Sequence, residues 1–136
     1  MKEIYKIAIK AAVEAGRQIM EIYDKGDFQV EMKNDESPLT IADKKANDII
    51  IKYLEATGKP IISEENRQLD FSERKTWKEC WIVDPLDGTK EFIKKNGEFT
   101  VNIALIEENV PVFGVIYVPT KKELYFGDVL EQKSYK

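Results

Sequence analysis

The chain has 136 residues, enough for one domain that buries roughly two thirds of the surface exposed by its unfolded chain. Apolar residues make up 43% and charged residues 34%, proportions of an ordinary soluble protein rather than a disordered one. The 21 basic and 25 acidic residues give a net charge of −4. This balance argues against a nucleic-acid surface, which needs a clustered basic excess.

The absence of histidine and the presence of a single cysteine narrow the possible chemistry. Ser-His and Cys-His nucleophiles and the usual zinc sites are excluded, so catalysis must use carboxylates, hydroxyls, lysines or an oxygen-ligated metal. Cys80 begins an apolar run, which favours a buried strand residue over a reactive thiol. Charges throughout residues 1–16 argue against a signal peptide and a membrane span, so we expect a cytoplasmic protein.

Two amphipathic helices are predicted in the N-terminal part of the chain. Apolar residues recur at helical spacing over residues 2–23 and predict the first helix. Alternating apolar residues then predict a short strand over residues 28–32, followed by a polar loop. The second helix is expected to begin after the N-cap Thr40 and to run to about Ala56.

The remainder of the chain predicts strands joined by short polar segments. These strands cover residues 60–62, 80–83, 99–105, 112–118 and 123–126. The strand at 80–83 is expected to end at Asp84-Pro85, and a short helix to start near Thr89. Close connections make the last three strands an antiparallel meander. We therefore expect a single α+β domain over residues 1–136, with the helix pair packed on a largely antiparallel sheet.

Acidic residues cluster at the ends of predicted strands and at a helix start. Glu64 and Glu65 follow the strand at 60–62, and Asp84 and Asp87 follow the strand at 80–83. Asp43 lies in the first turn of the second predicted helix. Magnesium prefers hard oxygen ligands of this kind, usually a few carboxylates together with water and substrate phosphate.

The segment after the second of these strands combines metal ligands with a phosphate site. Pro85 forces a bend, so Asp84 and Asp87 can converge while the Leu86 carbonyl turns inward. Gly88 lets a phosphate approach the backbone closely, and the amides of Gly88 and Thr89 offer an anion site at the next helix start. Carboxylates for metal beside amides for phosphate are what phosphate ester hydrolysis needs.

Each cluster alone also has a simpler interpretation. A D-P-x-D-G segment is a common turn, and Glu64-Glu65 is typical of a solvated acidic pair. Thr40 and Asp43 are explained as helix capping. The combination of the three, in this order, favours a site.

Residues 81–89, WIVDPLDGT, resemble the W-[IV]-[IV]-D-P-[LI]-D-G-T motif of the inositol monophosphatase superfamily, magnesium-dependent and lithium-sensitive phosphatases. Ser63-Glu64-Glu65 and the S-P-x-T-x-x-D stretch at 37–43 match the superfamily in the same order. The segments KEFI at 90–93 and NGEFTVNIALI at 96–106 are similar to its 3′(2′),5′-bisphosphate nucleotidase (CysQ-type) branch. The inositol phosphatase branch tends to have Thr-Asn-Phe after Asp-Gly-Thr. The resemblance covers essentially the whole chain and implies a sugar-phosphatase-like fold.

The resemblance implies a metal-binding role for the matching acidic residues. Glu64, Asp84 and the carbonyl of Leu86 would bind a first magnesium ion, and Asp84 and Asp87 would take part in binding a second. Glu65 is a weaker candidate. The complete site would hold two or three ions.

The resemblance also implies catalytic and substrate-binding roles. Thr89 and Asp43 would orient and deprotonate the attacking water, with Glu64 as a further catalytic residue, and the metals make a histidine base unnecessary. Asp87, Gly88, Thr89 and Glu64 would contact the phosphate ester. Lys33 is either a further phosphate contact or a solvated loop lysine.

The function implied is removal of the 3′-phosphate from adenosine 3′,5′-bisphosphate, a by-product of sulfate assimilation. The alternatives are an inositol or fructose phosphate phosphatase, and a non-catalytic half-domain that binds metal or anion. Members of the superfamily are about twice as long and carry a further ligand aspartate in a W-D-x-A type motif, which is absent here. We therefore expect a chain truncated before the second α/β half, with a C-terminal half or a second copy as its partner.

Overall fold

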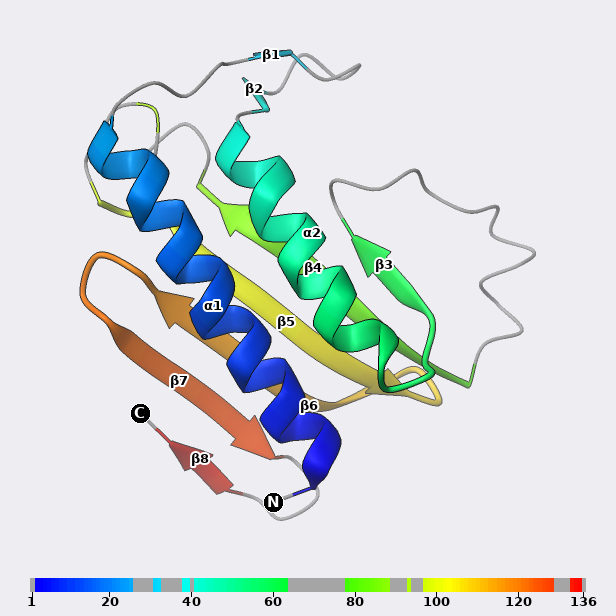
Figure 1. The fold of residues 1–136 in the computed structure, drawn as a ribbon. Coiled ribbons are helices and arrows are strands. Elements are labelled where there is room, and N and C mark those ends of the chain that lie inside the picture. Colours follow the sequence, from blue (N-terminus) through cyan, green and yellow to red (C-terminus); the bar gives the residue numbers. More distant parts are fainter. Residues whose placement is uncertain are drawn as a thin grey trace.

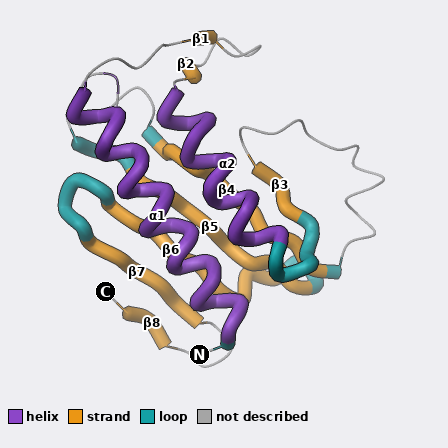
Figure 2. Tube along the Cα trace, viewed as in Figure 1, coloured by secondary structure: helices purple, strands orange, loops and turns teal. Residues whose placement is uncertain are grey.

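The computed structural model describes residues 2–25, 31–32, 38–39, 41–63, 78–88, 93, 97–128 and 133–135. Two helices, α1 (Glu3–Lys25) and α2 (Ile41–Glu55), pack side by side on one face of a six-stranded sheet (Figures 1 and 2). The sheet runs in the order β3 (Ile61–Ser63), β4 (Glu79–Asp87), β5 (Thr100–Glu107), β6 (Val110–Val118), β7 (Glu123–Asp128) and β8 (Lys133–Tyr135). A separate two-stranded pair is formed by β1 (Glu31–Met32) and β2 (Pro38–Leu39).

The sheet confirms the predicted fold class. Only β3 and β4 are parallel to each other among the described strand pairs, and the other neighbours in the sheet are antiparallel. The meander predicted for the last three strands corresponds to β5, β6 and β7. The short strand β8, which the sequence analysis did not predict, pairs with β7 and becomes the edge of the sheet.

Small residues bring the helices close to each other and to the sheet. The buried stripe of α1 includes Gly16 and four alanines with no exposed surface, Ala8, Ala11, Ala12 and Ala15. A Cβ atom at Gly16 would lie 2.3 Å from the ring of Tyr117 on β6, so this ring occupies the space beside the helix that a side chain at position 16 would need. Near the start of α1, Tyr5 stacks on Phe113 with 4.2 Å between the ring centroids.

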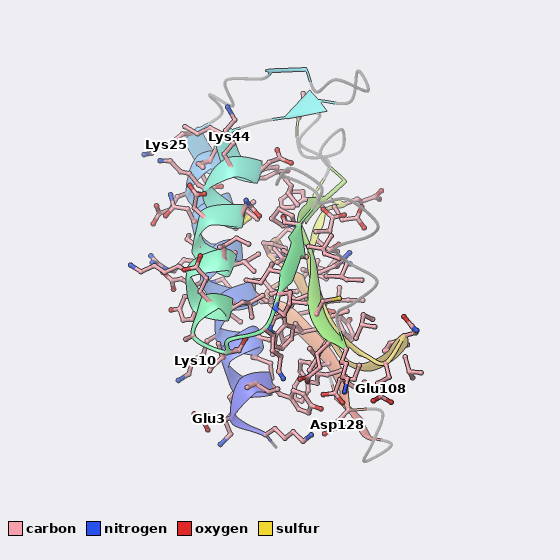
Figure 3. The ribbon with its side chains drawn as sticks, turned by 90° about the vertical axis from the view of Figure 1, so that its right-hand side faces the viewer. Glu3, Lys10, Lys25, Lys44, Glu108 and Asp128 are labelled. Atoms are coloured by element: carbon pink, nitrogen blue, oxygen red, sulfur yellow. The ribbon has the colours of Figure 1, made fainter. Side chains whose placement is uncertain are left out.

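Alternation along the strands divides the sheet into a covered face and an open face. Trp81 and Val83 of β4 are fully buried under the helices, whereas Ile82 between them is 44% exposed. Ile116 of β6 and Tyr125 of β7 share the open face with Ile82. Viewed from the side, the described helices both lie on the covered face (Figure 3). The open face therefore carries exposed apolar side chains.

Cys80 is half-buried rather than buried as predicted. It lies two residues before Ile82 and therefore shares the open face of the sheet. Among the described helices, none is long and apolar enough to cross a membrane.

Candidate metal and phosphate site

The strand β4 does not end at Asp84-Pro85 as predicted but continues to Asp87 through a β-bulge. Asp84 lies opposite Asn102 of β5, and Asp87 lies opposite Thr100. Two residues of β4, Pro85 and Leu86, are therefore set against one residue of β5. A bulge tolerates a proline that a regular ladder would exclude, because the extra residue is left out of the hydrogen-bonding pattern.

The bulge places the two aspartates on one face of the sheet. In a regular strand, residues three positions apart point to opposite faces. Here Asp84 and Asp87 are paired with Asn102 and Thr100, which are two positions apart and share a face. The side-chain amide of Asn102 donates a hydrogen bond from Nδ2 to Oδ2 of Asp87 at 3.1 Å. The structure thus brings Asp84 and Asp87 together on the open face.

Leu86 and Gly88 fix the backbone around these carboxylates. The side chain of Leu86 is 2% exposed and belongs to the apolar core. Gly88 has a φ of +95°, and a Cβ atom there would lie 2.8 Å from the carbonyl oxygen of Glu98. The fold itself thus requires glycine at this position, in addition to the close phosphate approach that the sequence analysis considered.

Asp43 reaches the same end of the sheet from the helix layer. It has no exposed surface and lies in the first turn of α2. One turn further, Oδ1 of Asn47 accepts a hydrogen bond from Oγ of Ser63, the last residue of β3. Because β3 and β4 are parallel, their carboxyl ends meet at one end of the sheet, where α2 begins (Figure 1). Asp43 therefore lies at the aspartate end of the sheet but on its covered side.

The remaining predicted site residues, Lys33, Glu64, Glu65 and Thr89, lie outside the described residues, as does the predicted N-cap Thr40. Glu64 follows Ser63 directly in the chain, and Ser63 pairs with Val83, the residue before Asp84. Within the described ranges, no three His, Cys, Asp or Glu side chains gather as a metal-binding group. The described part of the site contributes two carboxylates, and these hard oxygen donors suit magnesium.

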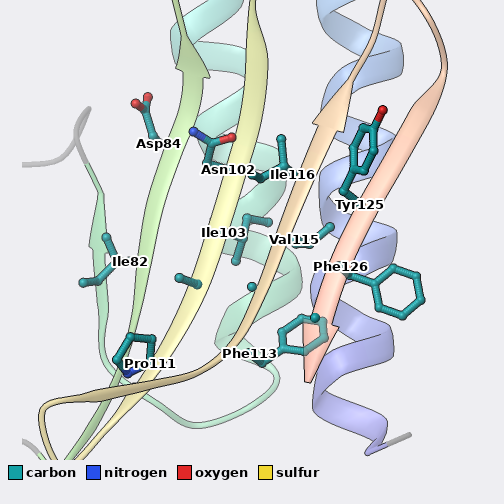
Figure 4. A pocket seen from close by; sticks show the side chains of 13 residues that line it. Ile82, Asp84, Asn102, Ile103, Pro111, Phe113, Val115, Ile116, Tyr125 and Phe126 are labelled. Atoms are coloured by element: carbon teal, nitrogen blue, oxygen red, sulfur yellow. The ribbon is translucent and has the colours of Figure 1, made fainter. Parts of the chain in front are cut away.

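The aspartate end borders a hollow on the open face of about 920 Å³ (Figure 4). Its polar border is formed by Asp84 and Asn102, and its apolar wall includes Ile82, Ile116 and Tyr125. Asn102 was not among the predicted site residues. Its signal in the sequence is a polar residue between Val101 and Ile103 of an otherwise apolar strand, but only the register places it opposite Asp84.

Comparison with known proteins assigns this chain to a phosphatase family. The model of the inositol monophosphatase family matches residues 1–135, and the chain belongs to this family.

The chain is similar to curated CysQ relatives and to solved structures of CysQ and suhB proteins. The chain is 46% identical to the 3′(2′),5′-bisphosphate nucleotidase CysQ of Salmonella typhimurium over 92% of this chain and 51% of the relative. The CysQ of Buchnera aphidicola is 51% identical over 84% of this chain and 44% of the relative. The crystal structure of CysQ from Bacteroides thetaiotaomicron has a TM-score of 0.80 and 56% identity, covering 91% of this chain and 45% of that one. The suhB protein of Bartonella henselae has a TM-score of 0.86 at 31% identity, covering 98% of this chain and 52% of that one. The chain thus spans about half the length of these relatives.

Proposed function

We propose that this chain supplies the metal-binding half of a magnesium-dependent phosphomonoesterase that removes the 3′-phosphate of adenosine 3′,5′-bisphosphate. The observation that carries the proposal is the bulge in β4, which sets Asp84 and Asp87 on one face at the end of the sheet. The substrate class is supported by the relatives named 3′(2′),5′-bisphosphate nucleotidase.

In this proposal, the acidic residues and one backbone carbonyl of the site bind the metal. Bound magnesium would supply Lewis acidity toward the phosphate ester and the attacking water. Asp84, Asp87, Glu64 and the carbonyl of Leu86 would hold the ions. The side chains of Trp81, Val83 and Leu86 are buried in the apolar core, and this burial holds this part of β4 in place.

The remaining tasks fall to the turn after β4 and to the start of α2. The amides of Gly88 and Thr89 orient the phosphate, and Asp43, with Thr89, takes up the proton of the attacking water. Asp43 has no exposed surface, and its position in the first turn of α2 brings a proton acceptor to the end of the sheet that carries the aspartates.

A substitution of one metal ligand tests the proposal. The chain is joined to the C-terminal half of the Bacteroides thetaiotaomicron relative, and magnesium-dependent phosphate release from adenosine 3′,5′-bisphosphate is measured. Asp84→Asn should abolish release while circular dichroism remains unchanged. The matched control is Asp48→Asn, which changes an exposed carboxylate of α2 and should leave release intact. Wild-type turnover by Asp84→Asn would contradict the ligand role.

The competing substrates are inositol and fructose phosphates, and they are separated by a direct comparison. Phosphate release from adenosine 3′,5′-bisphosphate and from inositol 1-phosphate is measured side by side under the same magnesium concentration. A clear preference for the inositol ester would reject the nucleotide as substrate.

We also propose that the open face of the sheet packs against a C-terminal half of the kind the relatives possess. Ile82, Ile116 and Tyr125 are 44%, 46% and 36% exposed on this face. Apolar side chains gathered on one face mark an interaction surface more often than a solvated one. Ile116→Lys should prevent co-purification with a co-expressed C-terminal half, whereas Val13→Lys, an exposed apolar position of α1, should not.

Two results would change this assignment. Full activity of the monomeric chain, measured by gel filtration and phosphate release, would contradict the need for a partner. Magnesium binding in a titration without turnover, with or without the second half, would instead favour a non-catalytic metal-binding domain.

A further inference from the structure

Asn102 occupies the position between the two aspartates and the apolar hollow. It pairs with Asp84 on one side and with Ile116 on the other. Its Nδ2 donates a hydrogen bond to Oδ2 of Asp87 at 3.1 Å. Figure 4 shows the amide nitrogen on the side of Asp84 and the amide oxygen on the opposite side. One side chain therefore turns its donor group toward both carboxylates.

The other end of the amide has no comparable contact within the part of the chain that the structure describes. Oδ1 of Asn102 is buried and has no hydrogen-bond partner among the described residues. A buried acceptor without a partner is unfavourable, and in native structures such an atom usually has a specific cause. The cause here is the donor end, because a carboxylate only accepts hydrogen bonds and the amide must present its nitrogen to Asp87. The hydrogen bond to Asp87 thus accounts for the orientation of the Asn102 amide.

We propose that Asn102 is a positioning residue of the metal site: its amide nitrogen holds the Asp87 carboxylate in the rotamer that faces the same ion as Asp84. The inference rests on the proposed function, in which both aspartates bind magnesium. In metal sites generally, a carboxylate that binds the metal is oriented by a hydrogen bond from a neighbouring residue that does not itself bind the metal. A neutral amide suits this task, since a lysine or arginine at the same place would compete with the metal cation for the carboxylates.

The first test examines positioning in the metal-free 136-residue chain. Three-bond couplings of Asp87, measured by NMR, report the distribution of its χ1 rotamers. The wild-type chain should show one rotamer, and Asn102→Leu should show averaging over several. The control Ile116→Ala alters packing beside Asn102 on the same face and should leave the Asp87 rotamer unchanged. If Asn102→Leu fails to fold, Asn102→Val offers a β-branched replacement suited to a strand.

The second test measures magnesium affinity of the same chain by isothermal titration. Asn102→Leu should bind magnesium about 10- to 100-fold more weakly, the usual loss when a residue that orients a metal ligand is removed. Ile116→Ala should bind with wild-type affinity. If Asn102 served only to stabilise the fold, Asn102→Leu and Ile116→Ala would both unfold at a lower midpoint but would bind magnesium with the same affinity.

The outcomes distinguish this inference from the proposed function. A fixed Asp87 rotamer or wild-type magnesium affinity in Asn102→Leu overturns the inference, while Asp84→Asn still reports on the metal site. Failure of the wild-type chain to bind magnesium, with Asp87 held in one rotamer, overturns the metal site itself and with it the metal role of Asn102.

Discussion

Replacing Gly88 by alanine tests whether the turn after the two aspartates needs a glycine, because of its positive φ and a close contact with the neighbouring backbone. Gly88 has a φ of +95°, which is unfavourable for a residue with a Cβ atom. The added Cβ would also lie 2.8 Å from the carbonyl oxygen of Glu98 and 3.3 Å from the Cα of Phe99. Both contacts are with backbone, so relief requires the turn and the start of β5 to move apart.

The magnitude follows from three contributions. A non-glycine residue in a sparsely populated region costs about 1–3 kcal/mol. The less flexible unfolded chain of an alanine variant offsets about 0.4–1 kcal/mol of this. Forcing extra volume into a close contact adds about 1–3 kcal/mol. We therefore expect Gly88→Ala to lower the free energy of unfolding by about 1–6 kcal/mol, the two costs added and the offset subtracted.

Two other glycines provide matched controls. Gly58 has a φ of +73°, but no atom of the described residues lies within 4 Å of an added Cβ, so Gly58→Ala isolates the backbone strain. An added Cβ at Gly114 would lie 3.9 Å from the nearest described atom, the carbonyl oxygen of Ile103, and the φ of Gly114 is not positive. Gly114→Ala should therefore be neutral or stabilise by up to about 1 kcal/mol. Urea unfolding should rank the midpoints Gly114→Ala, Gly58→Ala, Gly88→Ala from high to low. A midpoint for Gly88→Ala equal to or above that of Gly58→Ala would refute the close-contact argument.

Two further predictions concern the opposite end of β4. Trp81 donates a hydrogen bond from Nε1 to Oγ1 of Thr57 at 2.9 Å, so Trp81→Phe should lower the free energy of unfolding by about 1–3 kcal/mol, and thermal unfolding that matches wild type would contradict it. Nζ of Lys59 lies 2.5 Å from Oε2 of Glu79, and this hydrogen bond, opposed by desolvation, lowers the pKa of Glu79 below its ordinary value. The pair therefore contributes fully to the free energy of unfolding above the pKa of Glu79 in the unfolded chain. The contribution is lost as the pH falls through the lowered pKa of Glu79 in the folded chain. Lys59→Met should thus be less stable than wild type at pH 7, by under about 1 kcal/mol for a partly exposed pair, with a difference that disappears toward pH 3. Urea unfolding at both pH values measures it, and a constant difference would contradict the ion-pair argument.

The helices and most strands could be predicted from the sequence because each has a strong period. The two expected helices, 2–23 and the one after the N-cap Thr40 to about Ala56, correspond to Glu3–Lys25 and Ile41–Glu55. Their apolar residues recur at helical spacing because one face of each helix is buried. The strand β8 (Lys133–Tyr135) was missed because its sequence, KSY, contains no apolar run, whereas the equally short β3 does.

The arrangement of the site depended on register, which a single sequence does not specify. The residues WIVDPLDGT indicated two aspartates near a bend, and the proline suggested the end of the strand. The ladder continues instead, because β5 supplies partners on both sides of the bulge. Asn102 escaped prediction for the same reason, since its proximity to the aspartates arises across strands and not along the chain.

The bulge in β4 also gives the spacing of the motif a meaning in terms of parity. Without an extra residue in the ladder, two side chains share a face only when an odd number of residues separates them. The two residues between Asp84 and Asp87 are an even number, so the letters D-P-L-D encode a backbone irregularity as well as two ligands. Deleting Leu86 need not abolish the paired aspartates, because a regular ladder with a one-residue spacer also keeps them on one face. If Pro85 and Leu86 were both kept but paired regularly with β5, without a bulge, the side chain of Asp87 would turn toward the apolar layer under the helices.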